Sequence, residues 1–338
     1  GPTARDLERL GPAPDVLLGG PVAGYARSAS EDGLESLGDG APRPYWIVAR
    51  STPIGLPDVG ESSSRVALAD PREDAATLAW CLGRTESEGW RPGYAKLLDA
   101  YGTTSAAVGW RSGSARAEGE RGRADRTLAA LEDSPFRYEE GAAGPRGSRR
   151  SKAARAFLRF LVDRQGARMG PEFDGATAAG ASADVESLAA DLLGATLVDA
   201  REELAAAVSA TRKAGSPSWA LERLAQPPPW PPASIEKLLN QEGERGLALV
   251  ETLMSQIAPE PGLRDWLARD WLRPRRDLDR TVLAEIAAVD GGRLAREPRF
   301  RAWLRAEWTQ WARQRYRWVA RLAASAPTSP PPHVPSES

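Results

Sequence analysis

The sequence predicts a mixed α/β fold in the first half of the chain, followed by a mainly α-helical region from about residue 176. Up to about residue 125, short apolar runs are repeatedly followed by Gly or Pro and then by helical spacing, an order typical of α/β architecture with largely parallel strands. Beyond residue 176 the apolar residues recur almost wholly at helical spacing. The chain has 338 residues, enough for two domains of roughly 100 to 200 residues each.

The first part of the chain is expected to contain three strands and one helix. An apolar run ends in Gly19-Gly20-Pro21, which is typical of a buried strand closed by a tight turn. Aromatic and β-branched residues favour the two later strands. The expected elements are a strand at Pro14–Leu18, a helix at Val22–Ser30, strands at Tyr45–Ala49 and Arg65–Ala69, and a loop at Ser51–Ser64.

The next hundred residues are predicted to be mostly helical. Apolar spacing indicates two helices between Asp74 and Tyr101 with a break near Gly89–Gly93, and an amphipathic helix follows much later at Lys152–Val162. That later helix has Ala153, Phe157, Phe160 and Leu161 on one face. Other expected elements are a strand at Ser105–Val108, a helix from Ser112 to Arg123 that continues over Arg126–Asp133, and a Gly-rich, weakly extended segment at Arg137–Gly147.

The last part of the chain reads as a series of helices. The proline run Pro227–Pro232 is expected to be a stiff connector within it, and residues 326–338 a disordered tail. The predicted helices are Val185–Leu193, Val198–Arg212, Ser218–Leu224, Ile235–Ile257, Leu263–Leu272, Thr281–Ala288 and Arg299–Ala324.

Composition excludes several kinds of protein. The chain has 45 Lys and Arg against 46 Asp and Glu, a net charge of −1, so any electrostatic partner must bind locally. Its single cysteine, Cys81, and single histidine, His333, argue against Cys/His zinc sites and against His-based catalysis. No P-loop or GxGxxG motif is present, and the carboxylate pair Glu139-Glu140 has no evident catalytic partner. We therefore expect neither an enzyme nor a cofactor.

Six segments together resemble one known family in their order and spacing. They are PDVLLGGPVAGY at 14–25, WIVARSTPIGL at 46–56, VALADPR at 66–72, GWRPGYAKLL at 89–98, WRSGSARAEGERGRAD at 110–125 and KAARAFLRFLVDR at 152–164. The sequence resembles the extracellular solute-binding proteins of ABC importers, type 2 periplasmic binding proteins related to the iron-type members. More loosely, the helical region from about Leu192 resembles C-terminal extensions of planctomycete-like solute-binding proteins.

The resemblance implies two α/β lobes joined by hinge strands, with a small ligand in the crevice between them. Lobe 1 would comprise residues 1–44 and 141–175, lobe 2 residues 45–140, and a helical extension residues 176–325. It also implies an extracytoplasmic location and an ABC permease as partner. Residues 1–9 lack the apolar run of a signal peptide, and the start Gly1-Pro2 is typical of a cleavage scar.

The residues expected to line that crevice follow from the same resemblance. Helix N-termini and glycine-rich turns bring backbone N–H groups close to an anion, which favours a ligand that is anionic or carries a carboxylate. Each of these residues also has an ordinary structural explanation as a turn, a helix cap, a solvated charge or a packing residue. The expected ligand-binding residues are Gly19, Gly20 and Pro21 in lobe 1, and Asp70, Arg72, Thr77, Trp110, Arg111, Ser112 and Ser114 in lobe 2.

The sequence departs from the family in ways that keep other functions open. The family's first strand and helix have no counterpart between Gly1 and Ala13, and the adjacent tyrosines of ferric-ion binders are absent, which argues against a metal site. A degenerate binding domain serving as a helical interaction module is one alternative. Nucleic-acid binding is another, because residues 263–322 contain 15 Arg, 8 Asp or Glu and six Trp. Helical spacing favours instead a core stripe of Phe300, Leu304, Trp308, Trp311, Trp318 and Leu322.

Overall fold

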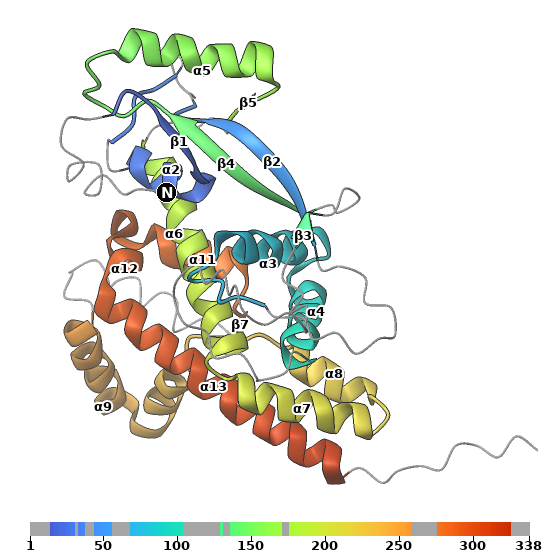
Figure 1. The fold of residues 1–338 in the computed structure, drawn as a ribbon. Coiled ribbons are helices and arrows are strands. Elements are labelled where there is room, and N and C mark those ends of the chain that lie inside the picture. The colour runs from blue at the N-terminus through green and yellow to red at the C-terminus, as the bar shows by residue number, and fades with distance from the viewer. Residues whose placement is uncertain are drawn as a thin grey trace, which may run out of the picture.

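The protein is mixed α/β and mostly helical (Figure 1). The computed structural model describes residues 14–30, 33–37, 44–55, 68–103, 129–130, 136–170, 176–257 and 276–325. The strands are β1 (Leu17–Pro21), β2 (Ile47–Gly55), β3 (Ala129–Ala130), β4 (Arg137–Ala143), β5 (Arg168–Met169), β6 (Pro229–Trp230) and β7 (Arg276–Asp277). Within the described residues, no helix is both long enough and apolar enough to cross a bilayer.

Most of the described residues lie in helices, most of them after residue 175. The helices are α2 (Val22–Ser30), α3 (Ala75–Ser87), α4 (Trp90–Thr103), α5 (Ser151–Gln165), α6 (Ala176–Leu193), the π-helix η1 (Gly194–Val198), α7 (Arg201–Lys213), α8 (Ser218–Ala225), α9 (Ala233–Ile257), α11 (Arg280–Ala288), the 3₁₀-helix η2 (Val289–Gly292), α12 (Arg293–Arg296) and α13 (Pro298–Ser325).

The main sheet is antiparallel throughout, so the expectation of largely parallel strands is wrong for the described residues. Its order is β1-β4-β2-β3, with β5 on β2, and every described pair is antiparallel. The antiparallel direction of β2 and β4 follows from the path of the chain. The strand β2 runs toward α3, and β4 runs back beside β2 (Figure 1). We call β1, β2, β4, β5, α2 and α5 the sheet body, and α3, α4, α7 to α9 and α11 to α13 the helical body; α6 contacts both.

Several strand predictions need correction. The first strand occurs at Leu17–Pro21, slightly later than expected, and β2 extends into the segment expected to be a loop. Leu68 and Ala69 belong to no strand, and Ala129–Ala130 pairs with β2 where a continued helix was expected. The remainder of that helix, and the elements predicted at 105–108 and 112–123, lie outside the described residues.

The sheet has a helical layer on each side. Leu158 of α5 packs with Ile47 and Ala142 on one face. On the other face, Tyr25 of α2 and Ala183 of α6 pack with strand residues. In the helical body α13 buries one continuous stripe, which confirms a core function for part of the predicted set. The buried residues are Phe300, Leu304, Trp308, Ala312, Tyr316, Val319 and Ala323, whereas Trp311 and Trp318 are partly buried and Leu322 is exposed.

The helix α5 includes the predicted Lys152–Val162 and is longer by one residue at its start and three at its end, but the face it buries is not the predicted one. It buries Ala154 and Leu158 against the sheet. Ala153, Phe157 and Phe160, which share the apolar face seen in the sequence, are exposed. The small Ala154 lets the helix approach the sheet closely, while the two phenylalanine rings are left facing solvent.

Glu186 on α6 gives the fold a pH dependence. Burial raises the pKa of this carboxyl from its usual 4.5 to about 7. Between those pH values the folded state binds more protons than the unfolded state, so stability should fall as the pH rises from about 4.5 to about 7. Relative to wild type, Glu186→Gln should become more stable by about 3 kcal/mol as the pH rises through this window. Urea denaturation of both proteins at several pH values measures the difference, and parallel curves would contradict it.

Candidate functional site

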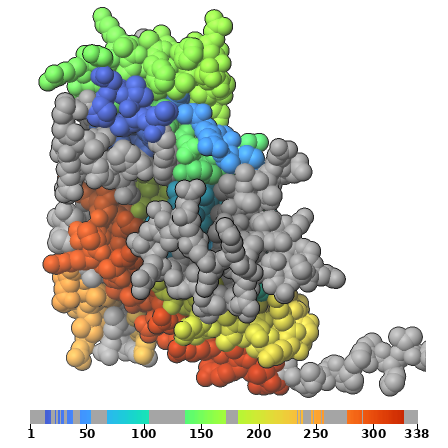
Figure 2. All heavy atoms as spheres, viewed as in Figure 1, coloured from blue at the N-terminus to red at the C-terminus, as the bar shows by residue number. Residues whose placement is uncertain are grey.

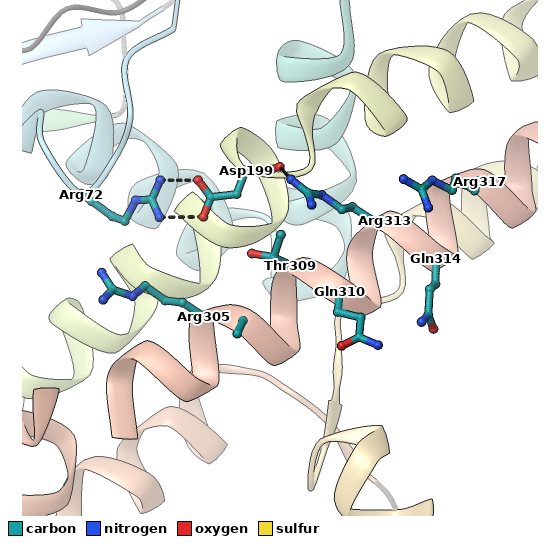
Figure 3. Close-up of a pocket in the computed structure, with 9 residues that line it drawn as sticks. Arg72, Asp199, Arg305, Thr309, Gln310, Arg313, Gln314 and Arg317 are labelled. Atoms are coloured by element: carbon teal, nitrogen blue, oxygen red, sulfur yellow. Dashed lines mark hydrogen bonds and ion pairs between the residues drawn. The ribbon is translucent and has the colours of Figure 1, made fainter. Parts of the chain in front are cut away.

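A pocket of about 830 Å³ lies along α13 in the helical body (Figure 3). Most of its lining comes from one face of this helix, and the rest comes from the loop before α3 and from the segment between η1 and α7. The lining residues are mostly cationic or amide-bearing: Arg72, Asp199, Arg305, Ala306, Thr309, Gln310, Arg313, Gln314 and Arg317.

Arginines placed four residues apart build the wall on α13. Positions 301, 305, 309, 313 and 317 share one helical face, and all except Thr309 are arginine. This face lies against α6, η1 and α7, whose acidic residues follow the same direction. Arg301 Nε lies 2.6 Å from Asp191 Oδ2, and Arg305 Nη1 lies 3.7 Å from Asp191 Oδ1.

Further along the helix, Arg313 and Arg317 contact Asp199 and Glu203. Arg313 Nη2 donates to the backbone oxygen of Asp199 at 2.8 Å. Arg317 Nη2 donates to Glu203 Oε1 at 2.5 Å, and Arg313 Nε lies 3.9 Å from Glu203 Oε2. The wall is thus a series of arginines, each held in place from the neighbouring helices.

Arg72 closes the pocket from the other side. Its guanidinium donates to both carboxylate oxygens of Asp199, at 2.8 and 2.7 Å, and its Nε and Nη2 also donate to Asp70, at 3.0 and 2.6 Å (Figure 3). The hydrogen bonds with Asp199 raise the pKa of Arg72 above its usual range, although partial burial opposes the shift. Arg72 therefore fixes the loop before α3 against the start of α7.

The π-helical turn η1 provides the space for this clamp. A Cβ atom on Gly194 would lie 2.4 Å from Arg72 Nε and 2.6 Å from its Cδ, so only glycine lets the guanidinium stem cross the helix here. The widened turn also places Asp199 just after its last residue. Such π-helical insertions often occur at functional sites, which is consistent with a pocket at this position.

The pocket presents positive charge to solvent although its charges are paired. The carboxylates behind the arginines of α13 are largely buried: the Asp191 side chain is 3% exposed and that of Glu203 is 15% exposed, whereas Asp199, which lines the pocket, is 34% exposed. The side chains of Arg305 and Arg317 are more exposed, at 41% and 62%. The carboxylates orient these arginines and leave part of each guanidinium group open to solvent.

The structure brings only part of the predicted site together. Arg72 lines the pocket, and Asp70 holds it. Thr77 is buried, and its backbone N–H and its hydroxyl both donate to Asp74 Oδ2, the N-cap of α3, so it is not available to a ligand. Gly19, Gly20 and Pro21 lie in β1 of the sheet body and do not line the pocket. Trp110, Arg111, Ser112 and Ser114 lie outside the described residues.

Sequence reasoning missed the α13 residues of the pocket. The recurrence of arginine every four residues was visible, but it was interpreted as a solvated face opposite the core stripe. What distinguishes these arginines is the row of carboxylates on α6 and α7, more than a hundred residues earlier in the chain. In the part of the chain that the structure describes, no group of three or more metal-ligating side chains occurs.

Comparisons with known proteins give no identity for the chain. No family model matches it, and no curated protein and no solved structure is significantly similar to it.

Proposed function

We propose that the protein captures a small anionic ligand, carrying carboxylate or phosphate groups, in the pocket between α13 and Arg72. The observation that carries this proposal is the convergence of Arg305, Arg313 and Arg317 on one pocket, each held by a carboxylate or a backbone carbonyl behind it. Guanidinium groups bind carboxylates and phosphates with two parallel hydrogen bonds, and a fixed orientation lowers the entropic cost of binding.

The size and the uncharged residues of the pocket fit the same class of ligand. A volume of about 830 Å³ is in the range of small-molecule sites. Gln310 and Gln314 supply amide donors and acceptors beside the arginines. A ligand with two acidic groups separated by a polar or short apolar spacer would use arginines one turn apart, such as Arg313 and Arg317, so di- and tricarboxylates and organic phosphates are the first candidates.

The wider role proposed is that of a solute-binding component of an ABC importer, handing its ligand to a permease outside the cytoplasm. The arginines that line the pocket support the ligand class expected for that role. The two long strands β2 and β4 of the sheet body contact α3 of the helical body, which supports a proposal of two bodies joined by hinge strands (Figure 1). The pocket itself lies within the helical body, so ligand capture there does not need a crevice between two α/β lobes.

The nucleic-acid alternative receives less support from the packing of the aromatic residues. Base stacking requires free ring faces. Trp308 is buried in the core, and Arg315 lies over the rings of Trp311 and Trp318, at 6.0 and 5.3 Å from their centres. The tryptophans of α13 thus contribute chiefly to packing.

Anion binding predicts a ligand-dependent rise in melting temperature. Orthophosphate, sulfate, citrate and succinate should be compared with glucose as an uncharged control. At about 100 times its dissociation constant, a ligand stabilises the native state by about 2.7 kcal/mol, which corresponds to a rise on the order of 5 °C. If no anion raises the melting temperature more than glucose does, the proposal is wrong.

Variants on α13 locate the binding site. Arg305→Ala and Arg313→Ala should each lower the affinity for the best anion by about 10- to 100-fold, because each removes a charge-assisted hydrogen bond. Arg321→Ala, which alters an exposed arginine of the same helix beyond the pocket, should leave the affinity unchanged. Isothermal titration calorimetry measures all three, and equal affinities in all three variants would place the anion elsewhere.

A further inference from the structure

The segment around α5 concentrates positive charge in a chain that is nearly neutral overall. Between residues 146 and 168 there are eight basic residues and one acidic residue, a net charge of +7, whereas the whole chain has a net charge of −1. The basic residues are Arg146, Arg149, Arg150, Lys152, Arg155, Arg159, Arg164 and Arg168, and the acidic residue is Asp163. This concentration is unrelated to the pocket on α13.

The helix α5 forms the outer layer of the sheet body and the edge of the molecule in Figures 1 and 2. Its buried residues, Ala154 and Leu158, face the sheet. On the outer side Phe157 and Phe160 are 41% and 48% exposed. Because they are three residues apart, their rings share one face of the helix, so the outermost surface of the helix is apolar as well as basic.

At least half of the basic residues of this segment have no ion-pair partner among the described residues. Arg155 lies 3.8 Å from Glu35, and Arg168 pairs with Glu139. Within the described ranges, Arg149, Lys152, Arg159 and Arg164 have no ion-pair partner, and all four are exposed. Arg149 and Lys152 precede the two phenylalanines in the chain, Arg159 lies between them and Arg164 follows them.

We propose that α5 is a membrane-surface helix that binds anionic lipid, lying parallel to the bilayer with Phe157 and Phe160 in the headgroup region. An amphipathic helix with aromatic residues on one face and Lys and Arg beside them is suited to this interface. Each basic residue near an anionic bilayer adds favourable energy, and the apolar rings add a component that salt does not screen. This proposal goes beyond ligand capture, since it concerns the opposite end of the molecule.

The shape of the surface distinguishes a bilayer from other anionic partners. Proteins that bind single-stranded nucleic acid without sequence preference use a positively charged groove that follows the backbone. Here the charge and the exposed aromatic rings belong to α5, which lies at the edge of the molecule (Figure 2) and can approach a flat surface with its outer side. A bilayer fits this convex face better than a strand of nucleic acid does.

Vesicle co-sedimentation tests the proposal. The full chain should bind vesicles of phosphatidylglycerol and phosphatidylcholine, should bind pure phosphatidylcholine vesicles much less, and should lose affinity as salt rises from about 0.1 M to about 0.5 M. Arg159→Glu combined with Arg164→Glu should weaken binding at least about tenfold. Phe157→Ala combined with Phe160→Ala should weaken it about tenfold without altering the melting temperature, because both rings are exposed.

A matched control distinguishes binding by α5 from a general effect of the net charge of the protein. Lys213→Glu combined with Arg321→Glu makes the same change in charge on exposed residues of α7 and α13, at the other end of the molecule, and should bind as wild type does. Equal weakening by this control would overturn the assignment to α5. The proposal would also be overturned if the Arg159 and Arg164 variant bound as wild type does, or if the chain did not bind the anionic vesicles. A third contradicting outcome is that a single-stranded oligonucleotide displaces the chain from the vesicles at a lower concentration than soluble anionic lipid does.

Discussion

Replacing Trp308 by alanine should reduce the free energy of unfolding by about 3 to 5 kcal/mol. The side chain is 1% exposed and lies where α13 meets α6, α9 and α11, in a cluster that includes Leu192, Ile235 and Leu283. Its Nε1 has no hydrogen-bond partner among the described residues, so the loss is one of apolar contact and of the cavity left behind. Urea denaturation followed by circular dichroism measures the change.

Trp219→Ala is the matched control for this prediction. Trp219 lies on α8 and is 37% exposed, so the same chemical change should cost less than about 1 kcal/mol there. Equal costs at the two positions would mean that α13 does not form the core of the helical body. The comparison also tests the pocket indirectly, because Arg305, Arg313 and Arg317 each follow directly on a buried residue of α13, namely Leu304, Ala312 and Tyr316.

The helices could be predicted because periodicity is a local property. The bounds of α2 agree fully with the prediction, and the break between α3 and α4 falls at Gly89, whose φ of +84° is a left-handed conformation that favours glycine. In contrast, periodicity did not show which side of α5 faces the sheet. Both faces of that helix carry apolar residues, and the choice is made by the fit of Ala154 and Leu158 to the strands.

The sheet could not be predicted to the same extent, since the direction of a strand depends on partners far away in the sequence. β4 was only expected to be weakly extended, because Glu139, Glu140 and Gly141 are unfavourable in strands. The structure gives a reason for the glycine: a Cβ atom at Gly141 would lie 2.6 Å from the ring of Tyr25. Gly141, which makes the segment unfavourable as a predicted strand, is therefore the residue that lets α2 pack on β4.

The candidate site was predictable only on the side of Arg72. A family resemblance selected that residue, and the structure places it in a pocket, but its partner Asp199 is 127 residues away and nothing in the local sequence pairs them. The arginines of α13 become a site only when the carboxylates of α6 and α7 lie beneath them. The arginine face of α13 therefore forms part of a pocket because of tertiary contacts with other segments, and no local sequence pattern shows this.

Replacing Arg72 by methionine should destabilise the protein by about 2 to 4 kcal/mol and abolish anion binding. Asp70 and Asp199 would then face each other without the cation between them, and an uncompensated, partly buried charge is costly. The matched control is Arg91→Met, which removes an ion pair with Asp277 whose arginine is 61% exposed. That exposed pair should be worth less than about 1 kcal/mol. Urea denaturation and titration calorimetry of both variants measure the difference.

Gly194→Ala tests the same clamp without removing a charge. The added methyl group would occupy the path of the Arg72 side chain, so the guanidinium must leave at least one of its two carboxylates. If the clamp organises the pocket, this variant should lower anion affinity as Arg72→Met does, and the two changes combined should cost less stability than the sum of the single costs. Additive costs would show that Gly194 and Arg72 act separately, and the pocket would then have no dependence on the π-helical turn.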